Sequence, residues 1–220
     1  MSNLDAIKFL ETLTYKNRDP EKEKTYYEAL GRFIASYAVA EASLHVLARH
    51  FSGTTDEKAR VIFGGMRLAD LTDRIRQMVR HDVAMQGIIA DQRIYTRIDD
   101  CLTQLNKIAD KRGELVHRTI SYIEDGFAVS NTSTAKSLMG IERKIITHTD
   151  LKNMRFDCNM IFLRLDSLAP DSPVANAFLQ PSGDDDDLWQ TTWRYISAPP
   201  NPQKPKHQKA QKERRRQRSA

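Results

Sequence analysis

The chain is organised around the stretch Lys107-Ile108-Ala109-Asp110-Lys111-Arg112-Gly113-Glu114-Leu115-Val116-His117-Arg118. This stretch ends a long pattern that begins near Asp91, in which apolar residues recur at alternating steps of four and three. That spacing places them on one face of a helix. The face consists of Ile94, Ile98, Cys101, Leu105, Ile108, Arg112 and Leu115. Arg112, which is always charged, therefore lies in a stripe that should contact other helices.

His117 follows Arg112 by five residues and can move a proton near neutral pH. It can instead act only as a helix-terminal histidine, which binds the last carbonyls and is favoured by the helix dipole. On an ideal helix five residues turn through about 500°, which leaves the two side chains about 140° apart. Both reach one phosphate only if the arginine extends, if the helix loosens near Gly113, or if a second subunit contributes.

The segment Arg112-Gly113-Glu114-Leu115-Val116-His117 resembles the Arg-(four to six residues)-His signature of the HEPN superfamily, small helical proteins that include many metal-independent ribonucleases. The resemblance covers about residues 25–168, including the long helix before the motif and the strand-like sequence after it. It implies RNA cleavage at a cleft between two subunits. Gly113 departs from the family, which usually has a polar residue there, often Asn, and this departure favours an inert module.

The same periodicity predicts further helices at about 4–14, 24–51, 56–63, 68–79 and 150–168. Asp19-Pro20 indicates a break before the second of them. After His117 the pattern changes to alternation around turn residues 124–126, which predicts a small β-hairpin or meander within 119–146. We therefore expect an all-α fold, an antiparallel HEPN-like helical bundle with a small β insertion.

Glu41 interrupts the apolar stripe of the second helix, where an ionised carboxylate needs a partner. Arg112 poses the same problem in its own stripe. The simplest hypothesis is that the two residues meet as a buried, hydrogen-bonded ion pair. Such a pair either fixes the helix register only or orients the arginine at a cleft. Tyr37 and His45, four residues to either side of Glu41, would extend the same polar strip.

Charge is concentrated at the C-terminus. Residues 201–220 hold eight of the 34 Lys and Arg residues and one of the 29 acids, so their net charge is +7 and that of the rest is −2. We expect a helical domain at 1–170, an acidic and aromatic linker or docking segment at 171–200, and a disordered basic tail at 201–220. The tail either attracts RNA, DNA or acidic proteins, or only keeps the chain in solution.

Cys101 and Cys158 fall on separate predicted helices without a neighbouring His or Cys cluster. They are expected to be buried thiols, and we expect no metal site and no cofactor. No apolar run approaches the length of a membrane span, and the N-terminus lacks the pattern of a signal peptide. A cytoplasmic protein without membrane contact is the expectation.

The leading hypothesis is a metal-independent endoribonuclease of toxin or defence type. The alternative is a catalytically inert HEPN-like module that binds RNA or a protein, and a purely structural scaffold is a third. The expected partners are RNA, a second copy of the chain and an antitoxin protein. The candidate catalytic residues are Arg112, His117 and Glu41, and the RNA-binding or supporting residues are Tyr37, His45, Gly113 and Arg118.

Overall fold

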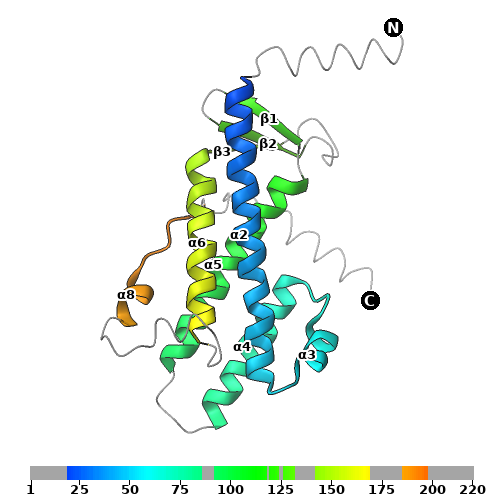
Figure 1. Ribbon diagram of the computed structural model, residues 1–220, viewed down its shortest axis with the longest axis vertical. Helices are drawn as coiled ribbons and strands as arrows, with labels where there is room; N and C mark the ends of the chain where they lie inside the picture. The colour runs from blue at the N-terminus through cyan, green and yellow to red at the C-terminus, as the bar shows by residue number, and fades with distance from the viewer. Residues whose placement is uncertain are drawn as a thin grey trace, which may run out of the picture.

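The computed structural model describes residues 19–85, 92–117, 119–123, 126–131, 142–168 and 185–197 (Figure 1). This part of the chain is mostly helical and carries a small antiparallel sheet, as predicted. Its elements are α2 (Pro20–Ser52), α3 (Asp56–Phe63), α4 (Leu68–Met85), α5 (Gln92–His117), β1 (Thr119–Ile123), β2 (Gly126–Ser130), β3 (Arg143–Ile146), α6 (His148–Ser167) and α8 (Asp185–Gln190). The predicted helix at 4–14 and the basic tail lie outside the described residues.

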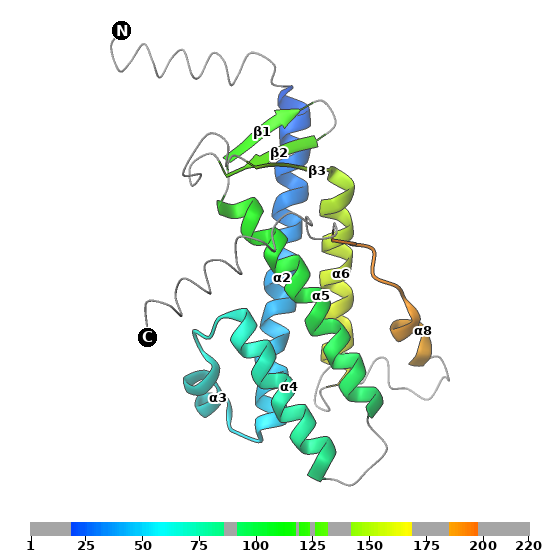
Figure 2. The same ribbon diagram turned by 180° about the vertical axis from the view of Figure 1, so that it is seen from behind.

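The long helices do not form a uniformly antiparallel bundle. Figures 1 and 2 show α4, α5 and α6 alternating in direction, whereas α2 and α6 lie side by side and run the same way. The connection at 53–67, which contains α3, returns the chain partway along α2 before α4 begins in the direction of α2. Two reversals then leave α6 parallel to α2. The antiparallel prediction is therefore correct for the last three long helices and wrong for α2, which runs in the same direction as α4 and α6.

Helix α2 begins four residues earlier than expected. The Asp19 carboxylate accepts hydrogen bonds from the backbone N–H groups of Glu21 (3.1 Å) and Lys22 (3.3 Å), and so caps the helix. Pro20 occupies the first helical position, where its fixed φ fits and its missing N–H costs nothing. The Asp-Pro pair is thus a start signal here. Helix α2 ends at Gly53, which adopts a left-handed conformation with φ 61°.

The apolar stripe of α5 forms part of the core. Ile98, Cys101, Leu105 and Ile108 are at most 1% exposed, and burial of such side chains contributes about 1.5–3 kcal/mol each. Cys101 and Cys158 are buried free thiols, as predicted. Burial raises the pKa of both to about 12, so they are protonated. Their role in this fold is packing.

The three strands pair in the order β1-β2-β3, and both pairings are antiparallel. The predicted meander is therefore present. Its middle strand is buried along the run from Phe127 to Ser130. The Tyr26 ring of α2 stacks on the Phe127 ring, which fixes the sheet against the N-terminal part of α2. The sheet thus covers the end of the bundle where α5 stops and α6 starts (Figure 2).

Residues 185–197 pack on α5 and α6, and we call them the strap. Two buried charges of α6 hold the strap by its backbone. Arg164 donates to the carbonyl oxygens of Leu188 (2.9 Å) and Thr191. Asp157 accepts the N–H groups of Arg194 and Tyr195, both at 2.9 Å. The described part of the segment expected to be a linker or docking element is therefore docked on its own domain.

Candidate functional site

Arg112 lies where α5 faces α2. Its guanidinium carbon is 5.6 Å from the centre of the Tyr37 ring, within the range of a cation–π contact. Tyr37 is 5% exposed, and Arg112 is half-buried. The prediction that Arg112 faces another helix is confirmed by this contact.

The charge of Arg112 is not neutralised locally. Its Nε is buried and has no hydrogen-bond partner. Within the described residues, Arg112 makes no ion pair with any carboxylate. A buried donor left unpaired costs about 1–3 kcal/mol. The guanidinium therefore has unused capacity for an anion.

The expected ion pair between Glu41 and Arg112 is wrong. Both residues are described, and neither a hydrogen bond nor an ion pair joins them. The Tyr37 ring occupies the position next to the guanidinium, while Glu41 lies one helical turn further along α2. The pKa of the Tyr37 hydroxyl is raised to about 12, chiefly by burial; the charge of Glu41 also acts to raise it, and that of Arg112 acts to lower it. Both charges thus act on Tyr37 without meeting.

His117 is the last residue of α5, and its side chain is exposed. Because α5 stays helical to this residue, the offset of about 140° from Arg112 is not relieved by loosening near Gly113. No hydrogen bond to the His117 ring is present within the part of the chain that the structure describes. Arg118, the next residue, lies outside that part. His117, the last residue of the motif, is therefore exposed at the end of α5 and has no orienting partner among the described residues.

Gly113 is an interior position of α5. A Cβ atom added there would meet no heavy atom within 4 Å, and its φ is not positive. Packing and backbone geometry therefore do not require glycine. The departure from the polar residue usual in HEPN proteins has no steric cause in this fold.

Glu114, within the motif, was not singled out from the sequence. Its carboxylate forms ion pairs with Lys111 of α5 (3.3 Å) and with Lys144 of β3. Partial burial raises the pKa of Glu114, but the hydrogen bonds and charges of the two lysines outweigh it, so that the pKa is lowered. The Lys111–Glu114 spacing is visible in the sequence, whereas the pairing with Lys144 depends on the sheet. Glu114 thereby ties the end of α5 to β3.

The polar strip expected along Tyr37, Glu41 and His45 is not continuous. Tyr37 is buried, Glu41 is half-buried and His45 is exposed. His45 instead lines a pocket of about 370 Å³ between α2 and α3, together with Arg49, Asp56, Arg60, Gly64 and Gly65. Arg49 and Asp56 form an ion pair across it. His45 therefore does not support Arg112.

Among the described residues, no three His, Cys, Asp or Glu side chains are grouped so that they could hold a metal ion. No described helix has the length and apolar character needed to cross a membrane. No family model, no curated protein and no solved structure matches the chain. The chemistry of its own residues is therefore what supports a function.

Proposed function

We propose that this chain is a metal-independent endoribonuclease similar to HEPN proteins, with Arg112 and His117 as its catalytic residues. The observation that carries the proposal is the state of Arg112. Its side chain reaches into the contact between α2 and α5, its Nε is buried and unpaired, and no described carboxylate forms an ion pair with it. A cation kept in this state is suited to binding a phosphate, which an arginine can contact through two parallel N–H groups.

The reaction requires no group beyond the RNA and two side chains. His117 takes the proton of a ribose 2′-hydroxyl, and the 2′-oxygen forms a bond to the adjacent phosphorus. The bond from phosphorus to the 5′-oxygen then breaks, and that oxygen receives a proton from the protonated His117 ring. The products end in a 2′,3′-cyclic phosphate and a 5′-hydroxyl. Arg112 stabilises the charge that develops on the phosphoryl oxygens.

A second copy of the chain supplies the geometry that one copy lacks. Arg112 and His117 point about 140° apart on a continuous helix. Two copies related by a two-fold axis can place Arg112 of one and His117 of the other on one phosphate. Because Val116 and His117 are exposed at the end of α5, a partner can reach them.

An inert RNA-binding module is the alternative, and two observations favour it. No described group orients the His117 ring, whereas a general base is usually held by a third group. Gly113 stands where a polar residue is usual in HEPN proteins, without a steric reason. Under this alternative Arg112 binds a phosphate but does not cleave its ester.

The test is cleavage of a mixed-sequence RNA by the purified protein in EDTA, with product ends identified by mass spectrometry. We expect 2′,3′-cyclic phosphate ends. Loss of a general acid–base group lowers a rate by about 10²–10⁴-fold, so His117→Ala should nearly abolish cleavage. His50→Ala, an exposed histidine of α2, is the matched control and should cleave like the parent.

The outcomes separate the two functions. Cleavage by His117→Ala at the parent rate would show that the activity does not use this motif. A parent protein that binds RNA but leaves it intact would establish the inert module. The molar mass in solution, measured by light scattering, should be that of a dimer for the parent and for His117→Ala alike.

A further inference from the structure

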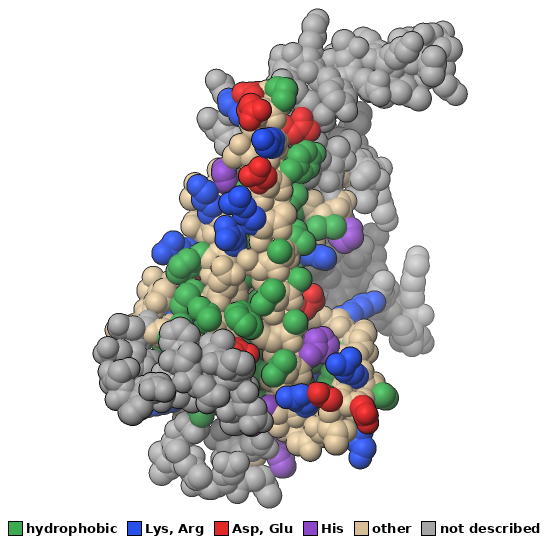
Figure 3. Space-filling view, in the orientation of Figure 1, with side chains coloured by type: hydrophobic (Ala, Val, Ile, Leu, Met, Phe, Trp, Pro, Cys, Tyr) green, Lys and Arg blue, Asp and Glu red, His purple; other side chains and the backbone are tan. Residues whose placement is uncertain are grey.

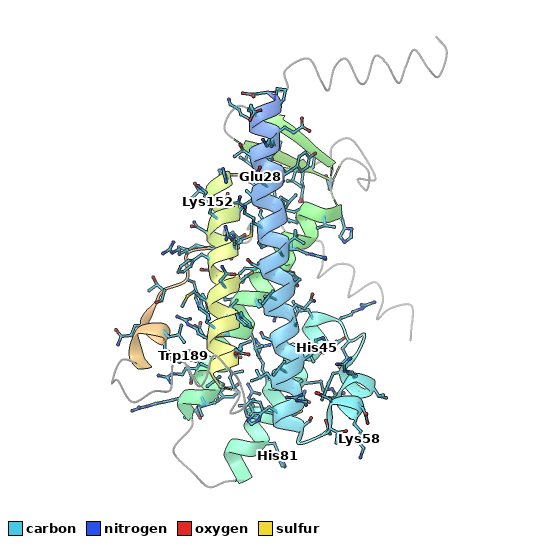
Figure 4. All side chains as sticks on the ribbon, viewed as in Figure 1. Glu28, His45, Lys58, His81, Lys152 and Trp189 are labelled. Carbon is cyan, nitrogen blue, oxygen red and sulfur yellow. The ribbon has the colours of Figure 1, made fainter. Side chains whose placement is uncertain are left out.

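A second cationic surface lies on α2 and α6, and Arg112 is not among its residues. A pocket of about 230 Å³ opens between the N-terminal parts of the two helices. Its polar lining is Thr25, Glu28 and Arg32 from α2 and His148, Lys152 and Arg155 from α6. Figure 4 shows Glu28 and Lys152 at similar heights on the two neighbouring helices. In Figure 3, blue side chains gather over this end of α2 and α6.

The pocket carries an excess of positive charge. Arg32, Lys152 and Arg155 bring three cations against one acid, Glu28, and His148 adds a further hydrogen-bonding group. Glu28 pairs with Arg32 at 3.6 Å, with both side chains more than half exposed. Such a pair contributes little, about 0–1 kcal/mol. Within the described residues, Lys152 and Arg155 have no ion pair at all.

The spacing of the cations arises from the parallel packing of α2 and α6. His148, Lys152 and Arg155 recur at steps of four and three, so they share one face of α6. Thr25, Glu28 and Arg32 share a face of α2 in the same way. Because the two helices start at the same end of the fold, these faces converge there and leave a groove between them. An antiparallel arrangement would have placed the two sets at opposite ends.

We infer that this pocket, which we call the α2–α6 site, binds backbone phosphates of RNA. The inference rests on RNA being the ligand in the proposed function and adds a second contact region to it. Two guanidinium groups and one ammonium group, exposed around an open groove, suit a chain that carries one phosphate per nucleotide. Arg32 and Arg155 contact phosphate oxygens from the two helices, and Lys152 contributes a point charge. RNA bound here is positioned on the domain while Arg112 acts elsewhere.

The test is binding of a 2′-O-methyl RNA 12-mer, which cannot be cleaved through its 2′-oxygen, at several salt concentrations. The triple variant Arg32→Gln, Lys152→Gln, Arg155→Gln removes three contacts. Each phosphate contact to a single strand contributes about 0.7 to the slope of log affinity against log salt. We expect the slope to fall by about 2 and the affinity at 50 mM salt to fall roughly 100-fold.

The matched control removes the same charge elsewhere. Lys58→Gln, Arg67→Gln and Arg74→Gln together alter three exposed cations of α3, of α4 and of the connection between them, outside the pocket. This variant should bind nearly as the parent does. Equal losses in the two triple variants, or no RNA binding by the parent, would overturn the inference. Competition by a poly-glutamate peptide that matches RNA at equal charge would also overturn it, because the site would then take acidic peptides.

A variant that gains affinity guards against loss through misfolding. Glu28→Gln removes the one acid at the rim and frees Arg32 from its pairing. RNA affinity should rise about three- to fivefold at low salt, an energy typical of one exposed charge. Glu57→Gln, an exposed acid of α3, should leave it unchanged. Failure of Glu28→Gln to bind more tightly than Glu57→Gln would count against the site.

Failure of this inference and failure of the proposed function give different results. If His117→Ala abolishes cleavage but the α2–α6 triple variant binds like the parent, the α2–α6 site alone is wrong. If the parent does not cleave RNA but the triple variant loses binding, the ribonuclease proposal alone is wrong. The uncleavable RNA keeps the two readouts independent.

Discussion

Arg112 lies over the ring of Tyr37, with its guanidinium carbon 5.6 Å from the ring centre and its Nε buried without a hydrogen bond. A cation–π contact of this kind contributes about 0.5–2 kcal/mol, whereas an unpaired buried donor costs about 1–3 kcal/mol. The two effects are similar in size and opposite in sign. Arg112 is therefore expected to add little to stability, which agrees with its proposed role in binding a phosphate.

Replacing Arg112 tests this balance. We expect Arg112→Met to leave the free energy of unfolding within about 1 kcal/mol of the parent, because the methionine fills similar space and removes an unpaired donor. Arg164→Met is the matched comparison. Arg164 is buried and donates to carbonyl oxygens of the strap, so its loss should cost about 3 kcal/mol. Urea denaturation at pH 7 measures both. Equal costs would show that Arg112 has a structural role.

A double-mutant cycle examines Glu41 and Arg112 directly. A buried ion pair would give a coupling energy of about 3–5 kcal/mol between Glu41→Gln and Arg112→Met. The structure has no such pair, and we expect the two changes to add to within about 1 kcal/mol. The free energies of unfolding of the parent, both single variants and the double variant provide the coupling. A value of about 3 kcal/mol or more would mean that the two side chains meet in solution.

Glu114 should make stability depend on pH. Its folded-state pKa is lowered, so its ion pairs stabilise the fold above the usual Glu pKa range, and this contribution is lost as the pH falls through the lowered pKa. We expect Glu114→Gln to cost about 1 kcal/mol at pH 7, and progressively less as the pH falls below the usual Glu pKa range and through the lowered pKa. Glu57→Gln, an exposed acid with no ion pair among the described residues, is the control measured alongside it. A cost for Glu114→Gln that persists in acid would show that its packing matters more than its charge.

Periodicity located the helices because burial of one face imposes a step of 3.6 residues wherever a helix packs. The stripe ending in Arg112 and Leu115 is an example, and alternation likewise revealed the strands around Phe127. The start of α2 was misplaced because Asp19-Pro20 is compatible both with a break and with a capped first turn. Only the positions of the following N–H groups distinguish these cases.

The prediction for the site that was wrong, the Glu41–Arg112 ion pair, concerns two residues that are far apart in the sequence. Glu41 and Arg112 are charged residues in the apolar stripes of two different helices, which suggested an ion pair. Whether their side chains meet depends on how the two helices are rotated about their axes and on what lies between them. Here the Arg112 guanidinium lies over the Tyr37 ring and forms no ion pair with Glu41. The contacts of the strap were not predicted from the sequence either. One signal was visible: Asp157 and Arg164 lie seven residues apart in the apolar pattern of α6, and buried charges need partners.

Gly113 should be replaceable with a gain in stability. Glycine in the interior of a helix costs about 0.5–1 kcal/mol relative to alanine, because the unfolded chain loses more conformational freedom. A Cβ at Gly113 meets nothing within 4 Å and its φ is not positive, so Gly113→Ala should raise the free energy of unfolding by that amount.

Gly53 is the matched control. It also has open space around it, but its φ of 61° strains any other residue, so Gly53→Ala should lower the free energy by about 1 kcal/mol. Both variants are measured by urea denaturation. If Gly113→Ala does not stabilise the protein, the end of α5 is not the continuous helix on which the offset between Arg112 and His117 depends.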